Sequence, residues 1–398
     1  MPSRLPSAKA AVRSDYLAFG RPDFSVEEIA AVTRVLRSGW VGMGPEVIAF
    51  EQELAAYLGV PHVVTVNSCT SALHLSLLVS GVGPGDEVIV PSLTWCSTAN
   101  AALYAGAHPV FCDIDPDTLC LTPALVRRQL TSRTKAVVVV HYGGLAIDIA
   151  ALRRALPARV RIVEDAAHAL GGKYPDGRMV GASGNAVCFS FYANKNLSTA
   201  EGGAIALSDN AAADRVRSLR QHALPLDAWK RFSHPKTILI SNQLTELGFK
   251  MNFTDLQATL GRVQLKRQKE FARRRRKVAD VYARRLKKLP FPVRLQAECT
   301  ADRHARHLFT VQFPWSRLRL DREQFILAMR ARNLGVTIHY APLHTMPLYG
   351  RKGRRPEPLP GVEEVARAIV TLPIGPRVTP ADARQVMDCL AEILAGRE

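Results

Sequence analysis

Between residues 60 and 210, short runs rich in β-branched residues alternate with segments of helical character. The runs that we predict to be strands cover residues 62–67, 86–91, 108–114, 135–142, 160–166, 187–192 and 203–208. Segments expected to be helical separate the first five runs, at 70–81, 97–107, 122–132 and 147–156. Nearly continuous apolar strands separated by helices are typical of a parallel sheet with helices on both faces. We therefore predict an α/β fold with a mostly parallel seven-stranded sheet.

The pattern changes near residue 255, where a long basic helix is expected to begin. The segments predicted from there on are a helix at 257–288, a strand within 307–315, a helix at 321–333, a strand at 335–341 and a helix at 380–396. A chain of 398 residues exceeds the size at which one hydrophobic core usually stops growing. We predict a flexible basic extension over 1–18, a large domain over 19–255 and a smaller C-terminal α/β domain over 256–398.

The composition is that of a soluble globular protein, with 47% hydrophobic and 22% charged residues. No apolar run approaches the roughly 18 residues that a membrane helix needs, and the basic N-terminal segment lacks the apolar core of a signal peptide. The seven cysteines form no CxxC pair, which argues against a disulfide scaffold or a zinc ribbon. We expect a cytoplasmic protein with no membrane partner.

The chain carries a formal net charge of +18, which raises nucleic-acid binding as a hypothesis. The densest basic cluster, RRRRK at 273–277, lies in a predicted helix, where a solvated helix face is the simpler interpretation. No helix-turn-helix, zinc-finger or RNP-type pattern accompanies it, so we predict no nucleic-acid partner. The same charge would equally attract a substrate that carries phosphates.

Ligands of a parallel sheet bind outside the carboxyl ends of its strands, so the residues that follow each predicted strand are candidates. The first strand is followed by NSCTSALHL, in which small residues open a helix and direct backbone N–H groups at one place. Such a place can bind a phosphate, although an ordinary helix N-cap has the same appearance. The second strand is followed by PSLTWCST, which places Trp95 at the same rim or in the core.

Two ionisable residues at later strand ends point to chemistry. Asp165 follows apolar residues in VEDAAHAL; it either caps the next helix or faces a cation such as a protonated ring nitrogen, since a buried carboxylate needs a partner. Lys195 lies in FYANKNLSTAEGG, and burial would lower the pKa of its amine and make it a nucleophile toward carbonyls. A phosphate site, an aromatic ring, a carboxylate for a pyridinium and an amine for an aldehyde together predict pyridoxal phosphate as the cofactor.

Beyond the first 18 residues, the chain resembles the nucleotide-sugar aminotransferases of the DegT/StrS type. The resemblance extends from FGRPDF at residue 19 to LPIGPRVT at 372–379. It is carried by GDEVIVPSLTWCSTANAALYAGAHPVFCDIDPDT, VEDAAHALGG, CFSFYANKNLSTAEGG, LGFKMNFTDLQATLG and HYAPLH. The resemblance implies the aspartate-aminotransferase (type I) fold. It also implies transfer of an amino group from an amino acid, expected to be L-glutamate, to a nucleotide-activated sugar, expected to be a UDP- or dTDP-4-keto-6-deoxyhexose.

The resemblance implies roles for individual residues. Lys195 would hold the cofactor as a Schiff base and shuttle the proton during transfer, and Asp165 would pair with the pyridinium nitrogen. The other residues implied at the cofactor are Cys69, Thr70, Ser190 and Asn252 at the phosphate, Trp95 stacked on the ring and His168 beside the ring hydroxyl. In this family the residue at the Asn252 position comes from the second subunit, which implies a homodimer with shared active sites. On the sugar side the implied candidates are His339, Tyr340 and Trp229.

Two positions depart from the family pattern. Cys69 stands where glycine or alanine is usual, and its side chain fits the phosphate turn only if its φ is negative. Arg306 stands where an aromatic residue is common, which weakens any transfer of sugar contacts. His304 and His307 are spaced like a metal-binding pair, but no third ligand accompanies them, so we predict no metal.

Three alternatives remain open at this stage. The acceptor could be a 3-keto sugar, which the sequence does not distinguish from a 4-keto sugar. Relatives that dehydrate sugars at C3 use the same cofactor but carry histidine at the lysine position, so Lys195 favours transfer. A basic regulatory protein that has kept the fold is disfavoured by the full set of cofactor residues.

Overall fold

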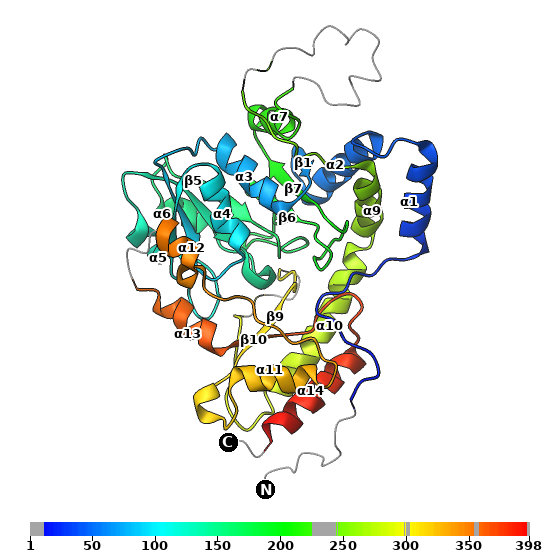
Figure 1. Cartoon of the computed structure of the whole chain (residues 1–398), viewed down its shortest axis with the longest axis vertical. Helices are drawn as coiled ribbons and strands as arrows, with labels where there is room; N and C mark the ends of the chain where they lie inside the picture. The colour runs from blue at the N-terminus through cyan, green and yellow to red at the C-terminus, as the bar shows by residue number, and fades with distance from the viewer. Residues whose placement is uncertain are drawn as a thin grey trace.

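The computed structural model describes residues 12–224, 244, 246–297, 299, 303–353 and 358–395. Its larger sheet consists of the seven predicted strands, and their observed ends lie within two residues of the predicted ones. These strands are β1 (His62–Val66), β2 (Glu87–Pro91), β3 (His108–Cys112), β4 (Thr134–Val140), β5 (Arg161–Asp165), β6 (Ala186–Ser190) and β7 (Gly203–Leu207). The predicted α/β class and the mostly parallel sheet are therefore confirmed (Figure 1).

The order of strands in this sheet is β1-β7-β6-β5-β4-β2-β3. The pairs β2–β3, β2–β4, β4–β5 and β5–β6 are parallel, whereas β7 runs antiparallel to both of its neighbours. Because of this reversal, β7 begins at the edge where the parallel strands end. Gly203, its first residue, pairs with Val66 at the end of β1 and with Ser190 at the end of β6.

The helices predicted between the strands are also present. They are α3 (Cys69–Val79), α4 (Cys96–Tyr104), α5 (Pro123–Gln129) and α6 (Ile149–Ala155), and they are joined by α1 (Val26–Ser38), α2 (Pro45–Leu58) and α7 (Asn210–Leu219). Side-chain oxygens cap most of their N-termini, as Ser68 does for α3, Thr122 for α5 and Asp148 for α6. Such caps satisfy backbone N–H groups that a helix cannot pair internally.

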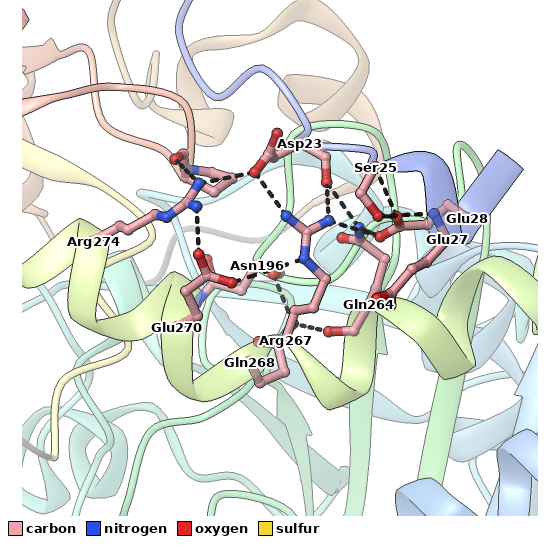
Figure 2. Close-up of polar contacts among 11 residues, drawn as sticks. Asp23, Ser25, Glu27, Glu28, Asn196, Gln264, Arg267, Gln268, Glu270 and Arg274 are labelled. Carbon is pink, nitrogen blue, oxygen red and sulfur yellow. Dashed lines mark hydrogen bonds and ion pairs between the residues drawn. The ribbon is translucent and has the colours of Figure 1, made fainter.

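The long helix predicted over 257–288 is instead two helices, α9 (Asp255–Lys266) and α10 (Gln268–Leu286), which meet at Arg267. Arg267 itself keeps a right-handed helical conformation, and its side chain contacts residues that are distant in sequence. The Arg267 guanidinium donates to Asp23 Oδ2 and to Glu28 Oε1, each at 2.9 Å, from the segment before α1 and from its first turn (Figure 2). α9 packs against α1 and α2, whereas α10 packs against α14 (Pro380–Leu394).

The C-terminal part contains a three-stranded sheet of β8 (Arg294–Leu295), β9 (Phe309–Gln312) and β10 (Ile369–Leu372). Its helices are α11 (Arg322–Arg330), α12 (Pro347–Lys352), α13 (Pro360–Ala368) and α14. The strand predicted at 335–341 is wrong, because this segment forms a single bridge, from Thr337 to Thr371. A strand not predicted from the sequence, β10, pairs with β9 instead.

Two hydrophobic clusters are present, one around the large sheet and one around β9, β10, α11 and α14. Residues 12–18 of the predicted extension lie against the second cluster, where Leu17 N–H donates to Asn333 O at 2.8 Å and Arg13 pairs with Asp382 at 2.6 Å. Residues 1–11 lie outside the described part. The domain limits 19–255 and 256–398 stay a prediction. Across the described residues, no helix is long and apolar enough to cross a membrane.

Candidate active site

A cavity of about 480 Å³ opens where β4, β5 and β6 end and β7 begins. The structure gathers nine of the predicted site residues around it. They are Cys69, Thr70, Trp95, Asp165, His168, Ser190, Lys195, His339 and Tyr340. Asn252 does not line this cavity, and Trp229 lies outside the described residues. The ligand that each residue contacts stays a prediction.

Lys195 lies in the turn between β6 and β7. Its backbone N–H donates to Tyr192 O at 2.9 Å, and Thr199 N–H closes the turn on Phe191 O at 2.9 Å. Burial lowers the pKa of the Lys195 amine to about 8, while the Asp165 carboxylate acts in the opposite direction. At pH 7 about a tenth of the amine is therefore neutral and nucleophilic, far more than for a lysine with an ordinary pKa of about 10.4.

Asp165 ends β5 and faces the cavity. Its Oδ2 accepts a hydrogen bond from Thr98 Oγ1 at 2.8 Å, and its Oδ1 accepts one from the Ala167 N–H at 3.1 Å. Burial raises the pKa of Asp165, and these two hydrogen bonds and the charge of Lys195 act against the rise. A cationic ring nitrogen at this carboxylate would supply the charge partner that its burial calls for.

The preceding residue, Glu164, points to the opposite face of the sheet, as alternation along a strand requires. Its carboxylate lies close to His141 Nε2 at 2.9 Å and accepts from Tyr174 at 2.6 Å and from Asn185 at 2.8 Å. Burial alone would raise the pKa of Glu164, but the hydrogen bond from His141 and the others lower it below its ordinary value. Of the two adjacent carboxylates, Glu164 is thus satisfied within the chain and Asp165 is open to a ligand.

The first turn of α3 presents a helix N-terminus to the cavity. Ser68 caps the helix by accepting from the Ser71 N–H at 3.1 Å, and Thr70 Oγ1 lies 2.8 Å from Ser97 Oγ. Cys69 is the first helical residue and does not adopt a positive φ, so its side chain is tolerated. A Cβ on Gly203 would lie 2.6 Å from Cys69 N, so the approach of β7 to this turn requires glycine. A phosphate suits such a helix N-terminus.

Rings surround the remaining walls of the cavity. Trp95 is 59% exposed and lines the cavity, so it does not belong to the core. His168 accepts from the Gly143 N–H through Nδ1 at 3.4 Å, and its Nε2 lies 3.0 Å from the Tyr340 hydroxyl. Burial, then the nearby Lys195, lowers the pKa of His168 well below its ordinary value and that of His339 to about 3. Both imidazoles are therefore neutral at physiological pH.

His304 and His307 do not face a common site. His304 Nδ1 accepts from the Arg306 N–H at 3.0 Å, whereas His307 Nδ1 lies 3.3 Å from Asn196 Oδ1. Arg306 does not line the cavity. In the part of the chain that the structure describes, no group of three or more His, Cys, Asp or Glu residues is placed to hold a metal ion.

Several cavity residues were missed from the sequence, although they neighbour predicted ones. They include Ser97, Tyr192, Asn194 and Glu201. Asn194 Oδ1 is buried and has no hydrogen-bond partner among the described residues, so a bound ligand would satisfy it. The amine, the carboxylate, the helix N-terminus and the exposed indole together fit pyridoxal phosphate.

The lowered pKa of Lys195 predicts a pH-dependent reactivity in the cofactor-free protein. Reductive labelling of Lys195 by an aldehyde should rise with a midpoint near pH 8, because the neutral amine is the reactive form, whereas ordinary lysines titrate near ~10.4. Peptide mass spectrometry would follow Lys195 beside the exposed Lys266 as an internal control. A labelling midpoint for Lys195 of about 10.4, the ordinary value for lysine, would contradict the expectation.

Comparisons with known proteins identify the family of this chain. The model of the DegT/DnrJ/EryC1/StrS aminotransferase family matches residues 22–391. The chain is 39% identical over 389 residues to the spore coat polysaccharide biosynthesis protein SpsC of Bacillus subtilis, covering 97% of this chain and 99% of that protein.

Solved structures are similar over nearly the whole chain. The aminotransferase TlmJ of Streptoalloteichus hindustanus is 35% identical with a TM-score of 0.85, covering 96% of this chain and 99% of TlmJ. The sugar aminotransferase Spr1654 of Streptococcus pneumoniae in its PMP form is 29% identical with a TM-score of 0.86, covering 94% of this chain and 98% of Spr1654. Spr1654 has also been solved in a PLP form, and the cofactor of this chain is pyridoxal phosphate. With a matching model over most of its length and a curated relative at 39% identity, the chain belongs to the DegT/DnrJ/EryC1/StrS aminotransferase family.

Proposed function

We propose that this enzyme transfers an amino group from L-glutamate to the keto group of a nucleotide-activated sugar, with a UDP- or dTDP-4-keto-6-deoxyhexose as the acceptor. The observation that carries the proposal is that the Lys195 amine, lowered in pKa, and the ligand-facing Asp165 carboxylate line one cavity. The names of similar proteins support a sugar acceptor, because they include a polysaccharide biosynthesis protein and sugar aminotransferases. We propose a cytoplasmic location.

Each group of cavity residues would have a separate role in amino transfer. The bound cofactor supplies an electron sink for the bonds at the amino carbon. Lys195 would hold the cofactor through its amine and, once released, move a proton to and from the substrate carbon as general base and acid. Asp165 would hold the proton of the ring nitrogen. The first turn of α3 with Ser190 would bind the phosphate, and Trp95 would cover the ring.

We further propose a homodimer in which Asn252 completes the phosphate site of the second subunit. Asn252 is absent from the cavity of its own chain, which supports a role elsewhere. His168 would lie beside the ring hydroxyl, and His339 and Tyr340 would face the sugar. Trp229 stays a sugar-side candidate on the sequence alone.

The proposal is tested by incubating the purified enzyme with L-glutamate and a panel of UDP- and dTDP-linked 4-keto and 3-keto sugars. Formation of 2-oxoglutarate together with an amino sugar is the expected result, and NMR of the product locates the new amine at C4 or C3. Release of a dehydrated sugar without 2-oxoglutarate would instead indicate the dehydratase alternative. No turnover with any nucleotide sugar, while other keto acceptors are aminated, would overturn the substrate class.

A further inference from the structure

The residue after the lysine, Asn196, is buried and fixed on every side. Its Nδ2 donates to Leu170 O at 3.2 Å and to Ala305 O at 3.0 Å, and its Oδ1 lies 3.3 Å from His307 Nδ1. Its backbone oxygen accepts from Gln268 Nε2 at 3.1 Å. The side-chain amide thus joins the lysine turn to two segments that are distant in sequence, and the backbone oxygen joins it to a third.

These contacts determine the state of His307. Because both N–H bonds of Asn196 Nδ2 are directed at carbonyl oxygens, the atom that faces His307 is the acceptor Oδ1. His307 Nδ1 must therefore carry the proton and donate it. Burial, followed by the charge of Lys195, lowers the pKa of His307 well below its ordinary value, so the ring is neutral with Nε2 unprotonated.

His307 in turn packs against His168, which lines the cavity. Its ring stacks on His168 with centroids 4.6 Å apart and an interplanar angle of 29°. His168 reaches Tyr340, which also lines the cavity. The Asn196–His307 pair therefore connects the lysine turn to His168.

The backbone side of Asn196 is anchored at the joint between α9 and α10. Figure 2 shows Gln268 directed at Asn196, beside the ion pairs of Arg267. Gln268 Nε2 is itself held by Gln264 O at 3.1 Å. Gln264 Nε2 donates to Glu28 Oε1 at 2.6 Å. Asn196 is thus held both through its side-chain amide and through its backbone oxygen.

We propose that Asn196, held by His307, is a positioning residue that fixes the reach of the Lys195 amine toward the cofactor aldehyde. The inference rests on the proposed role of Lys195. The adjoining peptide bond couples the Asn196 backbone to that of Lys195, so anchoring Asn196 fixes the position from which the Lys195 side chain extends into the cavity. An amine held near its target binds it as if at high local concentration.

Titrating the cofactor-free protein with two forms of the cofactor tests this role. Pyridoxal phosphate can link to Lys195, whereas pyridoxamine phosphate carries an amine in place of the aldehyde and cannot. Asn196→Ala should weaken pyridoxal phosphate binding by about tenfold, the size of one or two lost hydrogen bonds, and leave pyridoxamine phosphate binding unchanged. His307→Phe keeps a ring against His168 but removes the donor to Asn196, so it should act in the same direction with a smaller effect.

Tyr282→Phe is a matched control, because it removes one buried hydrogen bond, to Pro373 O at 2.7 Å, in the second cluster. It should change neither affinity. An equal loss of both affinities in Asn196→Ala and His307→Phe would mean a merely structural role, and no loss of either would also overturn the proposal. A separate result would show that Lys195 does not hold the cofactor: the wild type and Lys195→Ala would then bind pyridoxal phosphate equally well.

Discussion

Replacing Lys195 with alanine is expected to reduce amino transfer by at least about a thousandfold, within the range for loss of a general acid–base group. Burial lowers the pKa of His168 and that of His339, so neither imidazole is a good replacement for the lysine as a base. The variant should still fold, because the Lys195 side chain lines the cavity and is not part of the hydrophobic cluster around the large sheet. Turnover of glutamate and the visible spectrum of the reconstituted protein measure the effect.

Lys266→Ala provides the control for removing a lysine. Lys266 ends α9 and is exposed, so this variant should keep the wild-type rate and spectrum. Circular dichroism of both variants checks the fold. If Lys195→Ala retained the cofactor absorbance of the wild type, another amine would have to be the attachment point.

Replacing Asp165 with asparagine is expected to lower activity by about 10²–10³-fold, the loss typical of one preorganised charge at a reacting group. Asparagine keeps the shape but cannot hold the proton of a ring nitrogen. The same change should move the labelling midpoint of Lys195 below about 8, since the Asp165 charge raises the pKa of that amine. An unchanged midpoint would show that the two groups do not interact.

Although Asp165→Asn is expected to lower activity, it should raise the stability of the cofactor-free protein. The pKa of Asp165 is raised in the folded state, so its charge lowers the free energy of unfolding once the pH has risen through the unfolded and folded values. Asp165→Asn removes this penalty and should raise Tm at pH 7. For Glu164 the folded pKa is lowered, so Glu164→Gln should lower stability at pH 7 by about 1–3 kcal/mol. A shared sign for the two variants would contradict this account.

Local sequence patterns were sufficient for most of the fold and for the residues at the strand ends. The strands of the large sheet are continuous apolar runs, and the positions that follow them, such as Asp165 and Lys195, meet at one edge because the strands are parallel. The orientation of Asp165 toward the cavity also follows from alternation along β5.

The features that the sequence did not predict depend on contacts between distant segments. At the joint, Arg267 pairs with Asp23 and Glu28, more than 230 residues away. The segment 335–341 has the composition of a strand, yet it pairs only at Thr337. Asn196 and His307 carry no local signal for their pairing, because 111 residues separate them.

The joint between α9 and α10 also concerns how remote substitutions reach the chemistry. The two hydrophobic clusters are connected through this bend, and the first side chain after it, Gln268, holds the backbone beside the reactive lysine. A substitution that displaces α10 from α14 would therefore be expected to shift Gln268, and with it the backbone of the lysine turn, at a distance from the cavity. Substitutions in the C-terminal helices are expected to act on the position of the lysine turn, although none of those helices lines the cavity in the described part of the chain.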